Sequence, residues 1–86
     1  MPEKELVIVF ATTHLTLSAE KSLERAGIAH RTILKPRRIS SDCGLAIRID
    51  PGSTERCREI LLDDGLLPAG FYREAGGKWE LTERIG

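Results

Sequence analysis

The segment Leu6-Val7-Ile8-Val9-Phe10 restricts the fold of this chain more than any other. It is a short apolar run rich in β-branched side chains, which fits a strand in the interior of a sheet better than a helix. Because it is apolar at every position, both of its faces need covering. The rest of the chain must therefore supply neighbouring strands and apolar material on both sides of the sheet.

Two later segments have helical periodicity. The first is predicted to begin after the candidate N-caps in Ala11-Thr12-Thr13 and to end at Gly27, which can adopt the left-handed conformation that closes a helix. The second is predicted to begin at a cap from Ser53 or Thr54 and to end at Gly65. The side chains expected to face a core are Leu15, Ala19, Leu23 and Ala26 in the first helix, and Cys57, Ile60 and Leu61 in the second.

Four further segments have strand character. Residues 29–34 end at Lys35-Pro36, because proline cannot donate to a sheet ladder. Leu45, Ile47 and Ile49 alternate with Ala46, Arg48 and Asp50, which is typical of a half-buried strand. Residues 70–74 form a plausible fourth strand, and Gly76-Gly77 predicts a tight turn into a fifth strand over residues 78–82.

The order βαββαβ is that of the ferredoxin-like, split-βαβ motif. We therefore expect an α+β fold whose antiparallel sheet has the order 4-1-3-2, with two helices on one face and a C-terminal fifth strand at an edge. Residues 1–74 form the expected domain, and residues 75–86 a C-terminal extension that adds the hairpin strand. Because the helices cover one face only, we expect either a homodimer through the open sheet face or a covering C-terminal segment. The residues available for that covering are Trp79, Leu81 and Ile85.

Composition excludes several classes of protein. A chain of 86 residues has room for one small core. Thirteen Lys and Arg balance thirteen Asp and Glu, so no net charge attracts nucleic acid, and residues 45–49 lack the aromatic side chains on which RNA-recognition domains stack bases. No apolar run approaches the roughly 18 residues that span a bilayer, and residues 1–5 are not a signal-peptide start. We expect a cytoplasmic protein without membrane or nucleic-acid partners, in which Cys43 and Cys57 are free thiols.

Cys43 is the residue with the clearest candidate chemistry. It lies in the longest polar loop, Pro36–Gly44, which the expected topology brings beside the first turn of the first helix. The positive end of that helix and nearby cations favour a thiolate, whereas the adjacent Asp42 opposes it. The side chains expected to assist are those of His14, Arg37 and Arg38. Gly44 lacks a β-carbon, which leaves room for a second protein's backbone or a bulky sulfur adduct.

Other chemistry finds little support. A purely structural role for Cys43, at the start of a strand, is the alternative to reactivity. Cys57 is expected to pack in the core, and no C-x-x-C motif supplies a resolving thiol. His14 and His30 do not form a zinc spacing with the two cysteines, and phosphate-cradling and hydrolase motifs are missing. We therefore expect no metal, no cofactor and no enzyme activity.

One set of short segments resembles a known family. The segments are Thr12-Thr13-His14, Ala19-Glu20, Ala26-Gly27-Ile28, Pro36-Arg37 and Ser40-Ser41-Asp42-Cys43-Gly44-Leu45-Ala46-Ile47-Arg48. Together, over roughly residues 5–74, they resemble the selenium/sulfur carrier-like family of small bacterial proteins. The resemblance implies that Cys43 carries sulfur or selenium as a persulfide or perselenide, received from a donor protein and passed to an acceptor protein. It also places Ser40 and Ser41 in the site.

Two other functions stay open. The protein could be a small-ligand or anion-binding accessory module in which the thiol is incidental, or an interaction subunit without chemistry of its own. In the accessory module, the site would consist of Thr12, Thr13, Arg37, Arg38 and Ser41. The variant Cys43→Ser separates the readings, because binding survives it only in the accessory module.

Overall fold

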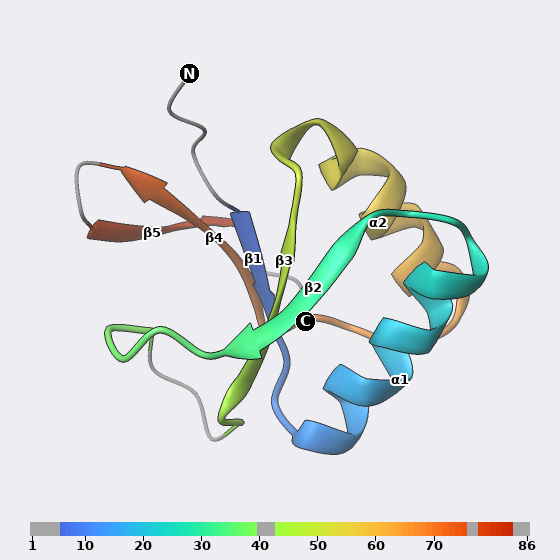
Figure 1. The fold of residues 1–86 in the computed structure, drawn as a ribbon, viewed down its shortest axis with the longest axis horizontal. Coiled ribbons are helices and arrows are strands. Elements are labelled where there is room, and N and C mark those ends of the chain that lie inside the picture. The colour runs from blue at the N-terminus through green and yellow to red at the C-terminus, as the bar shows by residue number, and fades with distance from the viewer. Residues whose placement is uncertain (1–5, 40–42, 76–77, 84–86) are drawn as a thin grey trace.

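The computed structural model describes residues 6–39, 43–75 and 78–83. Their elements follow the predicted order, with one 3-10 turn (η1) before the second helix (Figure 1). The elements are β1 (Leu6–Val9), α1 (Thr13–Arg25), β2 (His30–Leu34), β3 (Leu45–Ile49), η1 (Pro51–Ser53), α2 (Thr54–Asp63), β4 (Gly70–Ala75) and β5 (Lys78–Glu83). The fold is therefore α+β, with two helices and a five-stranded antiparallel sheet.

The sheet has the strand order β2-β3-β1-β4-β5. β1 lies in the middle, paired with β3 on one side and β4 on the other, as its apolar sequence predicted. Counted from β4, the first four strands stand in the order 4-1-3-2, and β5 pairs with β4 to extend the sheet by one strand. The complete order thus differs from the four-stranded order by this added edge strand.

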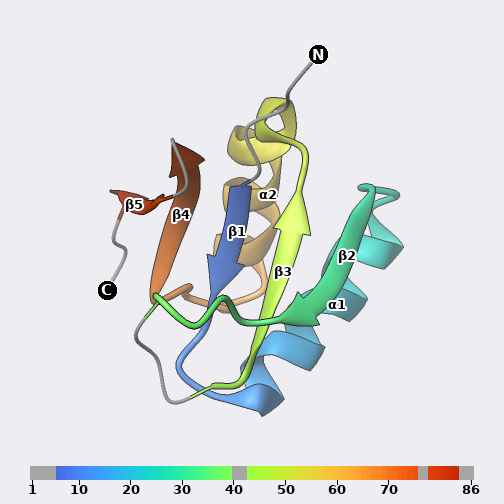
Figure 2. The ribbon, with the colours of Figure 1, turned by 60° about the vertical axis from the view of Figure 1, so that its left-hand side comes forward.

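Both helices pack on the same face of the sheet (Figures 1 and 2). α1 begins where predicted, because the Thr12 hydroxyl accepts a hydrogen bond from the Leu15 N–H at 3.1 Å. Gly27 and Gly65, with φ of 74° and 72°, directly follow the C-cap residues Ala26 and Asp64 and close the two helices in the left-handed conformation. The core on this face consists of Leu6, Ile8, Phe10, Ala19, Leu23, Ile28, Ile47, Ile49, Cys57, Leu61 and Phe71.

The predicted side-chain cap of the second helix is wrong. Ser53 is the residue before α2, but its side chain makes no capping hydrogen bond, and the Thr54 hydroxyl donates to the Pro51 carbonyl. Asp50 instead accepts from the Gly52 N–H at 3.0 Å and starts η1, which leads directly into α2. The 3-10 turn already supplies the first hydrogen bonds, so the helix starts without a Ser or Thr cap.

The opposite face of the sheet carries a second, smaller apolar cluster. Val7, Val9 and Ala46 are buried there under Ile39, which comes from the segment after β2 and is 1% exposed. Figure 2 shows this segment crossing the face that the helices leave free. Other side chains packed against the cluster are those of Ile33, Tyr72 and Trp79.

The expectation of a covering segment is thus confirmed for Trp79. Leu81 is 40% exposed, and Ile85 lies outside the described residues. The covering by Ile39 escaped prediction, because a single apolar residue in a polar loop has no periodicity. Among the described residues, no helix is both long and apolar enough to cross a membrane.

Candidate functional site

Cys43 lies two residues before the start of β3 and packs against the first turn of α1. Its sulfur is 3.2 Å from the Thr16 hydroxyl and 3.7 Å from the Thr13 hydroxyl. A backbone hydrogen bond of 2.9 Å from the Lys35 N–H to the Gly44 carbonyl extends the β2–β3 ladder to the residue beside the cysteine. The antiparallel topology therefore brings together the helix start and the loop end, as the element order predicted.

The hydrogen bonds of Cys43 depend on its protonation state. The Leu45 N–H points to the sulfur at 3.4 Å, and the Leu45 carbonyl lies 3.5 Å from it as an acceptor for the S–H. The Thr16 hydroxyl is also 3.0 Å from the Thr12 carbonyl, to which it donates. Because a hydroxyl has one proton, Thr16 can donate either to that carbonyl or to the sulfur. When Cys43 is a thiol, the Thr16 hydroxyl donates its proton to the Thr12 carbonyl. When Cys43 is a thiolate, the negative charge attracts this proton to the sulfur.

The pKa of Cys43 is lowered from its ordinary value of 9.0 by these contacts. Burial alone would raise the pKa, but hydrogen bonds from Thr16, the Leu45 N–H and Thr13 outweigh it, and the positive charge of Lys35 adds to their effect. Cys57 shows the opposite balance, because burial raises the pKa of its thiol to about 11 although the Arg56 charge lowers it. The two buried, free cysteines are therefore chemically distinct.

The predicted site residues lie in different settings. Thr13 contacts the sulfur, while Thr12 caps α1. His14, Arg37 and Arg38 are exposed, and the described cation that lowers the pKa of Cys43 is Lys35. Their part in the site stays a prediction. Ser40, Ser41 and Asp42 lie outside the described residues.

Sequence reasoning missed two contributors to the site. Thr16 follows Thr13 by three residues, a spacing that puts both hydroxyls on one face of a helix, and this signal was available. Lys35 precedes Pro36, and that proline suggested only the end of a strand. The Lys35 ammonium donates to the Ile39 carbonyl, which holds the charge on the loop that leads to Cys43.

Access to the sulfur is narrow. Cys43 is 2% exposed, whereas the adjacent Gly44 is exposed. A β-carbon built at Gly44 would meet no atom of the described residues within 4 Å, and Gly44 does not have a positive φ. Neither the backbone conformation nor the described neighbouring atoms therefore require glycine at this position. Within the described residues, no three His, Cys, Asp or Glu side chains are grouped to hold a metal ion.

A family model described as "Putative Se/S carrier protein-like" matches residues 5–73. The chain belongs to this family. The match includes Cys43 and all four of the contacts that lower its pKa. Searches among curated proteins and solved structures find no match.

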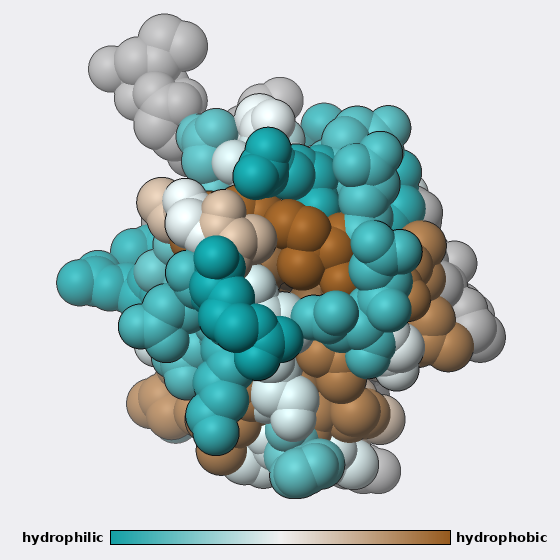
Figure 3. Space-filling view, turned by 90° about the vertical axis from the view of Figure 1, so that its right-hand side faces the viewer, coloured by the Kyte–Doolittle hydropathy of each residue, from teal (hydrophilic) through white to brown (hydrophobic). Residues whose placement is uncertain are grey.

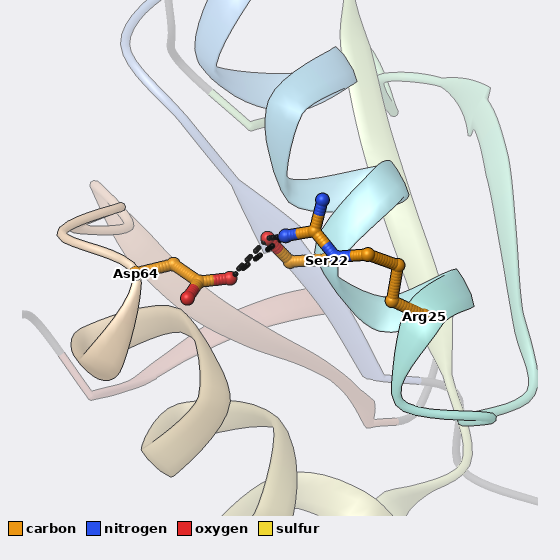
Figure 4. Close-up of polar contacts among 3 residues, drawn as sticks. All are labelled: Ser22, Arg25 and Asp64. Atoms are coloured by element: carbon orange, nitrogen blue, oxygen red, sulfur yellow. Dashed lines mark hydrogen bonds and ion pairs between the residues drawn. The ribbon is translucent and has the colours of Figure 1, made fainter.

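This Se/S carrier-like protein has a second polar cluster, at the far end of α1. The Ser22 hydroxyl donates to the Asp64 carboxylate at 2.5 Å, and the Arg25 guanidinium lies 3.4 Å from both (Figure 4). The cluster borders an open groove of about 430 Å³, lined by Ser18, Lys21, Ser22, Arg25, Asp64 and Leu66. Because the three groups satisfy one another, the cluster serves to tie α1 to the end of α2.

Proposed function

We propose that the protein carries a sulfur or selenium atom on Cys43, as a persulfide or perselenide, between a donor protein and an acceptor protein. The observation that carries this proposal is the set of hydrogen bonds to the Cys43 sulfur, which lower its pKa although the residue is buried. Membership of the Se/S carrier-like family supports the same chemistry. We further propose a ferredoxin-like fold extended by β5, and a bacterial cytoplasmic setting in which the thiol stays reduced.

The transfer consists of two exchange steps. The Cys43 thiolate attacks the outer sulfur of a donor persulfide, a new S–S bond forms, and the donor's cysteine leaves as a thiolate. An acceptor thiolate then attacks the outer sulfur on Cys43, and Cys43 leaves as a thiolate. Each step breaks one S–S bond and forms another, so no external oxidant or reductant is needed. A lowered pKa favours Cys43 both as the attacking group in the first step and as the leaving group in the second.

Thr16 has a specific part in this cycle. When Cys43 leaves as a thiolate, the Thr16 proton can turn from the Thr12 carbonyl to the sulfur, over distances of 3.0 and 3.2 Å. This donor is already in place and buried, so stabilising the negative charge needs no rearrangement of the backbone. The Leu45 N–H provides a second, fixed donor. Because Cys43 is 2% exposed, a partner must shift the chain around it. The expected side of approach is that of Gly44, which is exposed and where no described atom lies within 4 Å of an added β-carbon.

Intact-mass spectrometry tests the proposal. The reduced protein, incubated with a cysteine desulfurase and cysteine, should gain the mass of one sulfur atom that a reducing thiol removes. Cys43→Ser should lose this gain, and the matched control Cys57→Ser should keep it. A gain that depends on Cys57, or none with several sulfur and selenium donors, would contradict the proposal.

The accessory-module reading is supported by one observation: Cys43 is only 2% exposed, whereas Arg37 and Arg38, in the loop that precedes it, are exposed. In that case the exposed cations, with Thr12, Thr13 and Ser41, bind an anion and the thiol is incidental. A titration with inorganic phosphate, followed by NMR, separates the two functions. Shifts at Arg37 and Arg38 that persist in Cys43→Ser, together with no sulfur loading, would favour the module.

A further inference from the structure

β2 is an outer strand of the sheet, and its far side is a candidate surface for protein association. Among the described strands it pairs only with β3, and Figure 2 shows it at the opposite edge from β5. An unpaired strand edge presents backbone N–H and C=O groups that can pair with another strand. The question is which groups point outward and which partner strand they fit.

The register identifies the outward groups. The Lys35 N–H bonds the Gly44 carbonyl, one step beyond the pair Leu34 and Leu45, so Lys35 belongs to a hydrogen-bonded pair of the ladder. In antiparallel strands such pairs alternate with non-hydrogen-bonded ones. The residues that direct their backbone groups toward β3 are therefore Ile33 and Arg31. Those that direct them away from the sheet are His30, Thr32 and Leu34.

The side chains of this edge are poorly protected against pairing. Leu34 is 81% exposed, the highest exposure among the large apolar side chains described. Arg31 is the one charged residue of β2. The other outer strand, β5, contains Lys78 and Glu80, and alternating charges are a usual protection of an edge. Figure 3 shows that the helix side of the molecule is mostly hydrophilic, with separate apolar patches.

We propose that two copies of the protein join their β2 edges in antiparallel fashion, with a two-fold axis at Thr32. This register pairs Thr32 with the partner's Thr32, and His30 with the partner's Leu34 at both ends, so every outward residue of the five-residue strand is used. Arg31 then lies opposite the partner's Ile33. The cross-strand pair of β-branched side chains at position 32 and the covering of Leu34 both favour association.

The two neighbouring registers are worse. A shift in one direction places Arg31 directly opposite the partner's Arg31, and a shift in the other places it opposite the partner's Lys35. Like charges at directly opposed positions destabilise a strand pair. The register centred on Thr32 avoids both conflicts, which is why a second copy fits this edge. The face opposite the helices is already covered by Ile39 and Trp79, so the edge rather than that face is the proposed contact.

One interaction opposes this dimer and gives its association a characteristic dependence on salt concentration. The Thr32 hydroxyl donates to the Glu20 carboxylate at 2.6 Å, so the two Glu20 side chains would lie on the same side of the joined sheet near the axis. Their repulsion is screened by salt. We therefore expect association to strengthen at higher ionic strength and in Glu20→Gln, whose amide oxygen can still accept from Thr32.

Sedimentation velocity of the full reduced chain tests the proposal. A strand of five residues buries a small interface, so we expect a reversible dimer with a dissociation constant between about 10 µM and 1 mM. Thr32→Pro removes an outward N–H without breaking the β2–β3 ladder and should weaken the dimer by at least about tenfold. Leu34→Lys should act similarly. Amide exchange at Thr32 and Leu34 should slow as the protein concentration rises, while exchange at Ile33 stays slow throughout.

Two matched controls identify the surface. Thr32→Val keeps the outward N–H but loses the bond to Glu20, and Leu62→Lys places the same charge on an exposed leucine of α2. Both should leave the dissociation constant unchanged. A chain that stays monomeric up to about 1 mM would overturn the proposal. So would a dimer that survives Thr32→Pro with fast exchange at Thr32, because it would use another surface. The inference is independent of the chemistry of Cys43, so either can fail alone.

Discussion

At the scale of single residues, the Thr16 hydroxyl decides how well the Cys43 charge is accommodated. Thr16→Val removes the buried donor at nearly constant volume, so the pKa of Cys43 should rise and alkylation at pH 7 should slow by about tenfold, the worth of one charge-assisted hydrogen bond. Thr16→Ser, which keeps the hydroxyl, should restore the rate. The measurement is the pH profile of iodoacetamide labelling. An unchanged profile in Thr16→Val, with the melting temperature alone reduced, would mean that Thr16 is merely structural.

The two cysteines should also affect the pH dependence of the free energy of unfolding in opposite directions. The folded pKa of Cys57 is raised to about 11 from an unfolded value of 9.0, so its contribution to stability is complete below pH 9 and is lost as the pH rises through 11. The folded pKa of Cys43 is lowered, so its contribution is present above pH 9 and disappears as the pH falls through the folded pKa. Between pH 9 and 11, Cys57→Ala should therefore lose stability less steeply than the wild-type protein. Urea unfolding at several pH values measures this, and parallel pH dependences would contradict it.

At the scale of elements, the polar contact between α1 and the end of α2 rests on a partly buried hydrogen bond more than on an ion pair. Ser22 is 4% exposed and donates to Asp64, whereas the side chain of Arg25 is 72% exposed. Ser22→Ala should cost about 1–2 kcal/mol, because the carboxylate loses a shielded donor. Arg25→Ala should cost less than about 0.5 kcal/mol, since exposed ion pairs contribute little. Urea denaturation compares the two, and the reverse ranking would show that the charge dominates.

At the scale of the whole molecule, stability depends on covering both faces of the sheet. Ile39 is 1% exposed and covers the face without helices, so Ile39→Ala should destabilise the protein by about 2–4 kcal/mol. The matched control is Leu67→Ala, at an exposed apolar position, which should cost less than about 1 kcal/mol. Trp79, the single tryptophan, packs against the same cluster and should shift its fluorescence to the red in Ile39→Ala. Equal losses in the two variants would indicate that this face contributes no core.

Much of the architecture was predictable because its signals are local. The run Leu6–Phe10 indicated the central strand, Gly27 and Gly65 marked the helix ends, and the antiparallel order brought Cys43 to the start of α1. Each of these depends on residues close together in the chain or on the order of elements. The predicted side-chain cap at Ser53 shows the limit of such local signals. Ser53 is the last residue of the 3-10 turn that Asp50 starts, and this turn leads into α2 without a capping side chain.

The amino-acid sequence by itself determined the main elements, their order and the family, because strand pattern, turn chemistry and the family motif depend on neighbouring residues, and it singled out Cys43 as the thiol that we propose carries sulfur. Only the tertiary structure decided that the Thr16 hydroxyl, 27 positions away, lies 3.2 Å from the sulfur of that cysteine, and that Lys35 rather than the neighbouring arginines supplies the described positive charge. It likewise decided that the Ile39 side chain covers the face of the sheet that the helices leave free. Such contacts depend on distances and angles between segments that pack together, and a pattern along the chain contains neither.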